Sequence, residues 1–180
     1  GVTRLINETF QPLPLSHLDQ TEYAFDFFEQ REQNLLWLAT DRGLVRYRLD
    51  TAELALVGRK AGLPFDKIFQ VQADLHGNLW LSSNRGILRI SQQDANAVAE
   101  GTATRISYDL YGESDGMLSA QANGGSNPAA ILAQDGALWF ATASGVSRVQ
   151  PKRLADFAEA TPPVVLEELL VNGVAQKIDA

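Results

Sequence analysis

Leu79-Trp80-Leu81-Ser82-Ser83-Asn84-Arg85-Gly86-Ile87-Leu88-Arg89-Ile90 is a phrase that this chain contains three times. The other two copies begin at Leu36 and Leu138, so each copy holds one of the three tryptophans, Trp37, Trp80 and Trp139. In every copy a glycine follows the tryptophan by six residues and an arginine follows it by nine. The tryptophans lie 43 and 59 residues apart, which is the spacing of a repeat protein.

Each copy predicts a β-hairpin, because a short apolar run around the tryptophan is typical of a buried strand. Three residues that end in glycine suit the turn, and they are Asp41-Arg42-Gly43, Asn84-Arg85-Gly86 and Ala143-Ser144-Gly145. We expect a strand ahead of each hairpin, at residues 23–28, 68–73 and 130–133, and a strand after two of them, at 53–57 and 104–110. Residues 2–6 are expected to form the fourth strand of a preceding unit.

Four antiparallel strands in a repeat of this length make one blade of a β-propeller. A closed propeller needs at least four blades, and only three tryptophan phrases are present. The sequence therefore predicts an all-β fold, a propeller fragment of about three four-stranded antiparallel blades. The remaining blades are expected to belong to a longer parent chain. Residues 94–101 have a helical pattern that ends at Gly101 and are expected to form a surface insertion between strands.

The phrases resemble the repeat of the two-component regulator propellers. Residues 74–90 match its pattern best, with Asp-x-x-Gly-Asn-Leu-Trp followed by a hydroxyl pair, glycine and an aliphatic residue. Gly62-Leu63-Pro64 and Asp115-Gly116-Met117-Leu118 resemble the phrases that open blades in that family, and residues 123–140 look like its last blade. The first copy departs from the pattern, because Glu32-Gln33-Asn34 replaces the aspartate-glycine turn.

The C-terminal residues resemble the start of another domain. Residues 162–173 are similar to the first strand and turn of the Ig-like three-tyrosine domain that follows such propellers. Residues 151–157 form a connector with weak helical character, and Val171-Asn172-Gly173-Val174 predicts a type I′ hairpin. The expected organisation is propeller blades at residues 1–160, followed at 161–180 by a linker and the first strand and hairpin of a truncated Ig-like domain.

The resemblance implies an extracytoplasmic, ligand-sensing segment of a membrane-anchored signal-transduction receptor in the periplasm. Its output would be a histidine kinase, often a hybrid one, or a diguanylate cyclase, and the sensing part itself would not be an enzyme. Two other classes stay open. A propeller enzyme such as a lyase would need histidines or carboxylates that converge at the blade mouths, and a protein-interaction scaffold of the WD type would carry Gly-His and Trp-Asp signatures.

Composition limits the classes of partner that the chain can bind and the reactive groups that it can use. A net charge of −7 and a pI of about 4.8 disfavour binding to nucleic acid or to an anionic membrane. The absence of cysteine excludes disulfides and thiolate chemistry. No run of about 18 apolar residues is present and no apolar core region opens the chain, so we expect a mature or excised piece of a longer protein.

No catalytic residue, cofactor or metal site is predicted. The only histidines are His17 and His76, and His76 lies in the turn Asp74-Leu75-His76-Gly77-Asn78, where aspartate, glycine and asparagine serve turn geometry. This turn also begins like a calcium loop, but the later ligands and the bidentate glutamate of such a loop are missing. The phrase arginines are expected to pair with carboxylates or carbonyls rather than to form a ring that binds anions, and the tryptophans are expected to be buried rather than to stack on sugars.

Ligand-binding candidates come from the glycine-rich run at residues 123–127. It is either a long loop between strands or a polar rim in which Asn123, Ser126 and Asn127 touch a ligand. The ligand itself, a small molecule or an oligosaccharide, stays open. Because a three-blade arc leaves apolar faces uncovered at both ends, we expect the fragment to self-associate.

Overall fold

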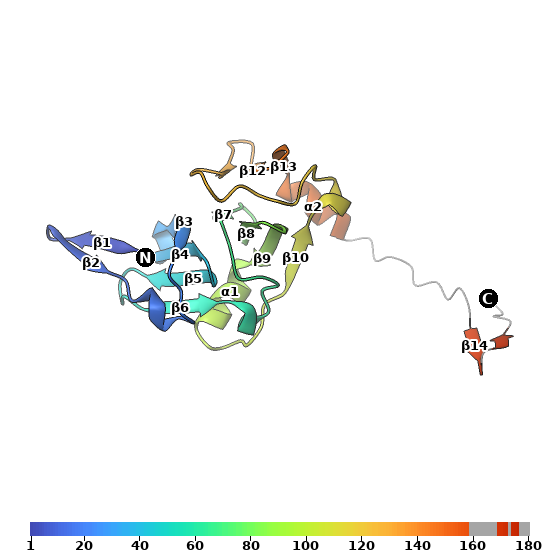
Figure 1. Cartoon of the computed structure of the whole chain (residues 1–180), viewed down its shortest axis with the longest axis horizontal. Helices are drawn as coiled ribbons and strands as arrows, with labels where there is room; N and C mark the ends of the chain where they lie inside the picture. Colours follow the sequence, from blue (N-terminus) through green and yellow to red (C-terminus); the bar gives the residue numbers. More distant parts are fainter. Residues whose placement is uncertain (159–168, 173, 177–180) are drawn as a thin grey trace.

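The computed structural model describes residues 1–158, 169–172 and 174–176. Most of the regular structure is β-strand, and each tryptophan phrase forms two neighbouring strands of one antiparallel sheet. Figure 1 shows the three sheets in succession, from blue and cyan through green to orange. The all-β fold class predicted from the repeats is confirmed. We call the three sheets the first, second and third blade.

The strands of each blade pair in chain order. The first blade consists of β3 (Ala24–Gln30), β4 (Leu35–Thr40), β5 (Gly43–Arg48) and β6 (Leu54–Val57). The second consists of β7 (Gln70–Ala73), β8 (Asn78–Ser83), β9 (Gly86–Ser91) and β10 (Tyr108–Tyr111). The third consists of β11 (Ala130–Leu132), β12 (Leu138–Thr142) and β13 (Gly145–Val149), and within the described residues it has no fourth strand.

Short helices and two hairpins complete the described chain. The 3₁₀ turns are η1 (Leu15–His17), η2 (Arg31–Gln33), η3 (Arg59–Ala61) and η4 (Glu113–Asp115), and the helices are α1 (Gln92–Ala99) and α2 (Pro151–Ala158). The hairpins are β1 (Thr3–Ile6) with β2 (Thr9–Pro12), and β14 (Leu169–Val171) with β15 (Val174–Gln176). The latter confirms the hairpin predicted around Asn172. Of residues 162–173, which resemble the first strand and turn of the Ig-like domain, residues 162–168 and 173 lie outside the described residues.

The blades pack face to face, and always with the same two faces. One face carries the tryptophan, and we call it the Trp face; the opposite face is rich in leucine, and we call it the Leu face. Trp37 lies in one core cluster with Leu79, Leu81, Leu88 and Ile90 of the second blade. Trp80 lies in another with Leu138 and Phe140 of the third. Each fully buried side chain of this size contributes about 1.5–3 kcal/mol relative to an exposed one.

The hairpin turns contain two residues rather than the three predicted, because Gly43 pairs with Thr40 and Gly86 with Ser83. Both glycines have a φ of +128°, a region that favours glycine. A Cβ on Gly43 would lie 2.5 Å from the carbonyl oxygen of Val57, at the end of the fourth strand. Glycine is therefore needed both for the backbone turn and for the close approach of that strand.

Residues 2–6 do not form a fourth strand, which corrects the sequence prediction. Within the described residues, β1 pairs with β2 alone. Gly1-Val2-Thr3-Arg4-Leu5 repeats the glycine-apolar-x-arginine-apolar pattern that the third strand of each blade carries. The Arg4 guanidinium donates to the Tyr47 hydroxyl on the Leu face of the first blade. β1 and β2 thus correspond to the third and fourth strands of a further blade.

The tryptophans differ in burial. Trp37 and Trp80 are fully buried, whereas Trp139 is 38% exposed, so the prediction that all three are buried is wrong for Trp139. Register places Ile131 and Arg148 beside Trp139 on the Trp face of the third blade, and Ile131 and Val146 are also exposed. Among the described residues no further blade covers this face.

We expect the isolated chain to form dimers through its two end faces. At the other end of the arc, Leu5 and Phe10 are paired across β1 and β2 and are exposed. This face corresponds to a Leu face, the kind of surface that covers Trp37 and Trp80. Light scattering after size exclusion at micromolar concentration should give twice the monomer mass, and Trp139→Glu should restore the monomer. A monomer across the dilution range would contradict the expectation.

Candidate functional site

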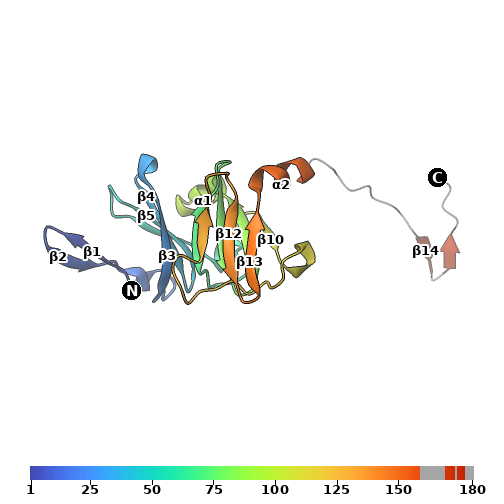
Figure 2. The same cartoon turned by 90° about the horizontal axis from the view of Figure 1, so that it is seen from above.

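Two buried polar side chains join the innermost strands of neighbouring blades. β3 packs beside β7, and β7 beside β11; Figure 2 shows the strands of the blades from above. The Asp26 carboxylate on β3 accepts a hydrogen bond from the Val71 amide at 3.1 Å. The Gln70 side-chain oxygen on β7 accepts from the amides of Ala129 and Ala130 at 3.0 and 3.2 Å. Asp26 pairs with Ala39 and Gln70 with Ser82, two residues after the respective tryptophan, so the two side chains occupy the same repeat position.

The glycine-rich loop at residues 123–127 precedes β11, the innermost strand of the third blade. Asn123 closes the loop, since its side-chain oxygen accepts from the Gly125 amide at 2.8 Å and its side-chain amide donates to the Ser126 hydroxyl at 3.2 Å. Asn127 instead points to the first blade, where it donates to the second oxygen of Asp26 at 3.3 Å. The loop therefore links the third blade to the first through a buried carboxylate.

A pocket of about 450 Å³ opens where this loop meets the second blade. Cavities of this size are typical of small-ligand sites. Its lining includes no ionisable side chain: it consists of Phe69, Asn84, Gln121, Ala122, Asn123, Gly124, Gly125, Thr142 and Ala143. The Gly124 backbone lies against the Phe69 ring so closely that a Cβ would come within 2.5 Å of a ring carbon. The pocket thus offers side-chain amides, backbone groups and one aromatic ring.

The structure separates the three ligand-binding candidates. Asn123 lines the pocket, whereas Ser126 is not part of the lining and accepts a hydrogen bond from Asn123, and Asn127 donates to Asp26. Phe69, Asn84 and Gln121 were not predicted from the sequence, because they come from three separate segments that only the fold brings together. Asp26 was missed as well. A charged residue inside the aromatic run Phe25-Asp26-Phe27-Phe28 is the signal that could have found it.

Asp26 is 7% exposed, and its burial raises its pKa above the ordinary value of 3.8, although the Val71 and Phe27 amides and Asn127 partly offset the rise. A raised folded-state pKa means that Asp26 contributes stability below pH 3.8 and that this contribution is lost as pH rises through the folded pKa. Ionisation of the buried Asp26 carboxylate therefore lowers the stability of the folded state as pH rises.

We expect Asp26→Asn to remove this pH dependence. Asparagine keeps one oxygen for the Val71 amide and carries no charge to desolvate. Urea unfolding at several pH values between 4 and 7 should show the variant gaining stability relative to the parent as pH rises. If the difference in stability between the variant and the parent is constant over this pH range, the pKa of Asp26 is not raised.

The turn around His76 is organised by Asp74. The Asp74 carboxylate accepts from the amides of His76 and Asn78 through one oxygen, and from the side chains of Asn78 and Trp80 through the other, at 2.8 to 2.9 Å. These bonds hold the pKa of Asp74 below 3.8 even though burial acts in the opposite direction. Both His17 and His76 are exposed. Asp74 thus serves the turn and the tryptophan rather than a ligand.

We expect no metal dependence. Within the described part of the chain, no group of three or more His, Asp or Glu side chains is placed to hold an ion. Calcium or zinc should therefore leave the melting temperature unchanged. A rise that a chelator reverses would contradict this, because a bound ion stabilises the native state by mass action.

The phrase arginines are structural, as predicted. Arg46 is 1% exposed and donates to Glu100 at 2.9 Å and to the Asn96 side chain at 3.0 Å. Arg89 pairs with Asp109, and Arg148 pairs with Asp135 and lies over the Trp139 ring. Since each guanidinium has its own carboxylate, the three do not form an anion-binding ring. The predicted surface insertion is in fact α1, whose Asn96 and following Glu100 bind Arg46 and whose Ala95 is buried.

The fold is shared with extracellular domains of known proteins. No protein-family model and no curated protein matches the chain. Among solved structures, it is similar to the extracellular domain of the hybrid two-component system BT3049 from B. thetaiotaomicron, with a TM-score of 0.67 and 19% identity over 96% of this chain and 23% of that one. The chain has the fold of part of this extracellular domain.

A second sensor shows the same likeness. The extracellular domain of BT4673 from B. thetaiotaomicron gives TM-scores of 0.58 and 0.60 in two structures, described as one-component and hybrid two-component systems. The identities are 16% and 18%, over 82% of this chain and 18% of those. The chain thus spans less than a quarter of each solved sensor domain. None of the helices in its described part is long and apolar enough to cross a membrane.

Proposed function

We propose that this chain is a ligand-sensing segment from the periplasmic part of a membrane-anchored receptor. Its fold, which it shares with extracellular domains of two-component systems, supports this proposal. The output of the receptor would be a histidine kinase or a diguanylate cyclase, and the blades would be two-component regulator propeller blades that precede an Ig-like domain at residues 161–180. The segment itself would bind and not catalyse.

The observation that carries the proposal is the neutral pocket at the junction of the second and third blades. Its amide side chains Asn84, Gln121 and Asn123 can donate to and accept from hydroxyl groups, and Phe69 presents part of an aromatic ring. No carboxylate, histidine or lysine lines it to move a proton or to hold a charged group. This combination suits an uncharged, polyhydroxylated ligand such as an oligosaccharide.

Calorimetric titration of the chain with a panel of neutral oligosaccharides tests the proposal. Gln121→Ala and Asn84→Ala should weaken binding of a hit by about tenfold or more, since each removes a hydrogen bond worth about 1.5 kcal/mol. Gln93→Ala removes an exposed amide on α1, away from the pocket, and should leave binding unchanged. Binding that all three variants retain would place the site elsewhere, and a panel without hits would overturn the ligand class.

A further inference from the structure

A pocket of about 420 Å³ lies beside β6, the outermost strand of the first blade. Three parts of the chain line it: residues 17–19 in and after η1, residues between 56 and 61 from β6 through η3, and residues 98 and 104 in and after α1. We call it the rim pocket. It shares no residue with the neutral pocket, and its size is typical of small-ligand sites.

The rim pocket has an apolar part that two core clusters hold in place. Leu18 and Leu56 are partly buried and pack against the cluster around Leu38. Val98, on α1, packs against the cluster that contains Trp37. All three side chains also line the pocket, so each has an apolar surface that a ligand can cover.

The ionisable side chains of the rim pocket are mostly cationic. They are His17, Asp19, Arg59 and Lys60, on a chain whose net charge is −7. The Lys60 ammonium lies 3.6 Å from the Asp19 carboxylate, and the two side chains are 91% and 57% exposed, which makes this a weak pair. Arg59 donates to the carbonyl oxygen of Pro64 at 2.8 Å and has no ion pair within the described residues. The pocket therefore has positive charge that its one carboxylate does not neutralise fully.

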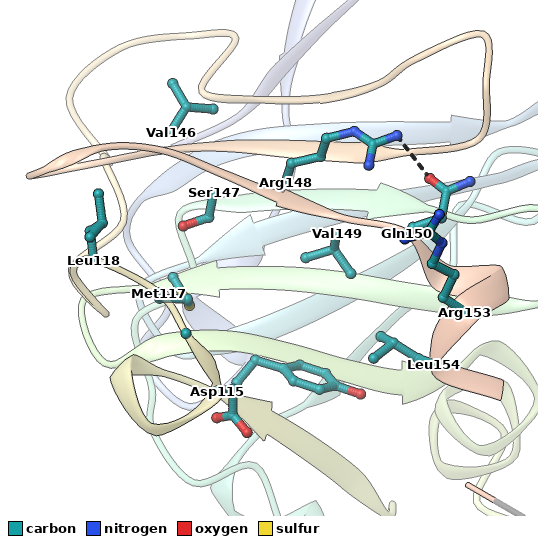
Figure 3. Close-up of a pocket in the computed structure, with 12 residues that line it drawn as sticks. Asp115, Met117, Leu118, Val146, Ser147, Arg148, Val149, Gln150, Arg153 and Leu154 are labelled. Atoms are coloured by element: carbon teal, nitrogen blue, oxygen red, sulfur yellow. Dashed lines mark hydrogen bonds between the residues drawn. The ribbon is translucent and has the colours of Figure 1, made fainter. Parts of the chain in front are cut away.

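The groove along β13, of about 380 Å³, is a different kind of site. It also has apolar side chains and two arginines, but Arg148 is already bonded to Asp135 and to Gln150, the latter bond being drawn in Figure 3. The outer edge of β13 is unpaired within the described residues, and such an edge favours another strand as its occupant. The rim pocket is therefore the better candidate for a small charged ligand.

We propose that the rim pocket binds a small amphipathic carboxylate. Its apolar body would cover Leu18, Leu56 and Val98, and its carboxylate would lie near Arg59 and Lys60. Recognition needs both parts, because an exposed ion pair contributes little by itself and an apolar body alone leaves the cations without a partner. The proposal does not rest on the proposed function, since the two pockets have no residue in common.

Calorimetric titration with sodium hexanoate tests the proposal, with hexanol and sodium acetate as matched probes. Hexanol has the same apolar body without the charge, and acetate has the charge without the body. Hexanoate should bind more tightly than either, and its affinity should fall as salt is raised, because salt screens exposed charges. If hexanoate does not bind, if hexanol binds as tightly, or if salt has no effect, the proposal is overturned.

Lys60→Glu with Lys67→Glu as its control locates the carboxylate. Both substitutions change the net charge equally, and Lys67 is exposed and does not line the pocket. Lys60→Glu removes one attraction and adds one repulsion, so it should weaken hexanoate binding at least about fivefold relative to Lys67→Glu. Since Lys60 is 91% exposed, the variant should fold like the parent. Equal affinities of the two variants would overturn the proposal.

Amide shifts in nuclear magnetic resonance spectra give a second readout on the unmodified chain. Hexanoate should shift the amides of residues 17–19, 58–61 and 98–104, which form or adjoin the rim pocket. Shifts confined to residues 131–149 would place hexanoate on the exposed Trp face of the third blade instead, and this result would overturn the proposal.

Discussion

Trp80→Ala should lower the free energy of unfolding by about 3–5 kcal/mol, the range of large aromatic truncations in protein cores. The Trp80 ring is fully buried between the second and third blades, where it stacks on Tyr111 at 5.6 Å and packs against Leu138 and Phe140. Its removal leaves a cavity in the junction rather than in one sheet, so both blades lose their contact.

Trp139→Ala is the matched control for this prediction. The residue has the same place in its phrase but no covering blade within the described residues, and it should cost no more than about 2 kcal/mol. Urea unfolding of the parent and both variants, followed by circular dichroism at a dilution at which the chains are monomeric, measures the two values. If Trp80→Ala unfolds within about 0.5 kcal/mol of the parent, which is the range of surface substitutions, the packing described for this junction is wrong.

Asp74→Ala should be the second most damaging change, with a loss of about 3 kcal/mol. It removes four hydrogen bonds to one carboxylate and leaves the Trp80 indole N–H buried without an acceptor, which alone costs about 1–3 kcal/mol. Asp109→Ala, in the same blade, breaks only a half-exposed ion pair with Arg89 and should cost at most about 1 kcal/mol. Equal losses for the two variants would contradict the role given to Asp74.

The pH dependence of Asp74 has the opposite sign to that of Asp26. Hydrogen bonds hold the pKa of Asp74 below its ordinary value of 3.8, so its contribution is present above that pH and is lost as pH falls through the folded pKa. The difference in stability between the parent and Asp74→Ala should therefore shrink below pH 4. A difference that stays constant down to the lowest pH at which the parent is folded would show that the charge of Asp74 does not matter.

The tryptophan phrases were enough to predict the blades, because each phrase holds its own strands and turn within twelve residues. The same phrase could not reveal which tryptophan is covered. Burial of Trp80 depends on Leu138 and Phe140, which come from the next repeat. The acceptor of the tryptophan N–H is the residue on the first strand that lies opposite the residue two before the tryptophan. That position is held by Gln30 in the first blade, Asp74 in the second and Ala133 in the third.

The candidate site was harder to predict for the same reason. Asn123 was found because it lies in a conspicuous run of glycine and asparagine. Phe69, Asn84 and Gln121 are up to 52 residues apart in the chain and carry no local signal, since only the packing of two blades brings them to one pocket. Helix α1 was recognised from its pattern, but its bond to Arg46 joins residues 50 positions apart and follows from the stacking of the blades.

Every junction between the described blades has the same direction along the chain. The Trp face and the inner-strand polar side chain of one blade, Asp26 or Gln70, are both directed at the next blade and never at the previous one. An array of blades that all face the same way can grow or shrink by whole repeats. An inserted blade brings one Trp face and one Leu face, so both new junctions have the same contacts as the old one. Gene duplication can therefore change the number of blades without redesigning an interface, whereas loss of half a repeat leaves a junction in which a Trp face no longer meets a complete Leu face.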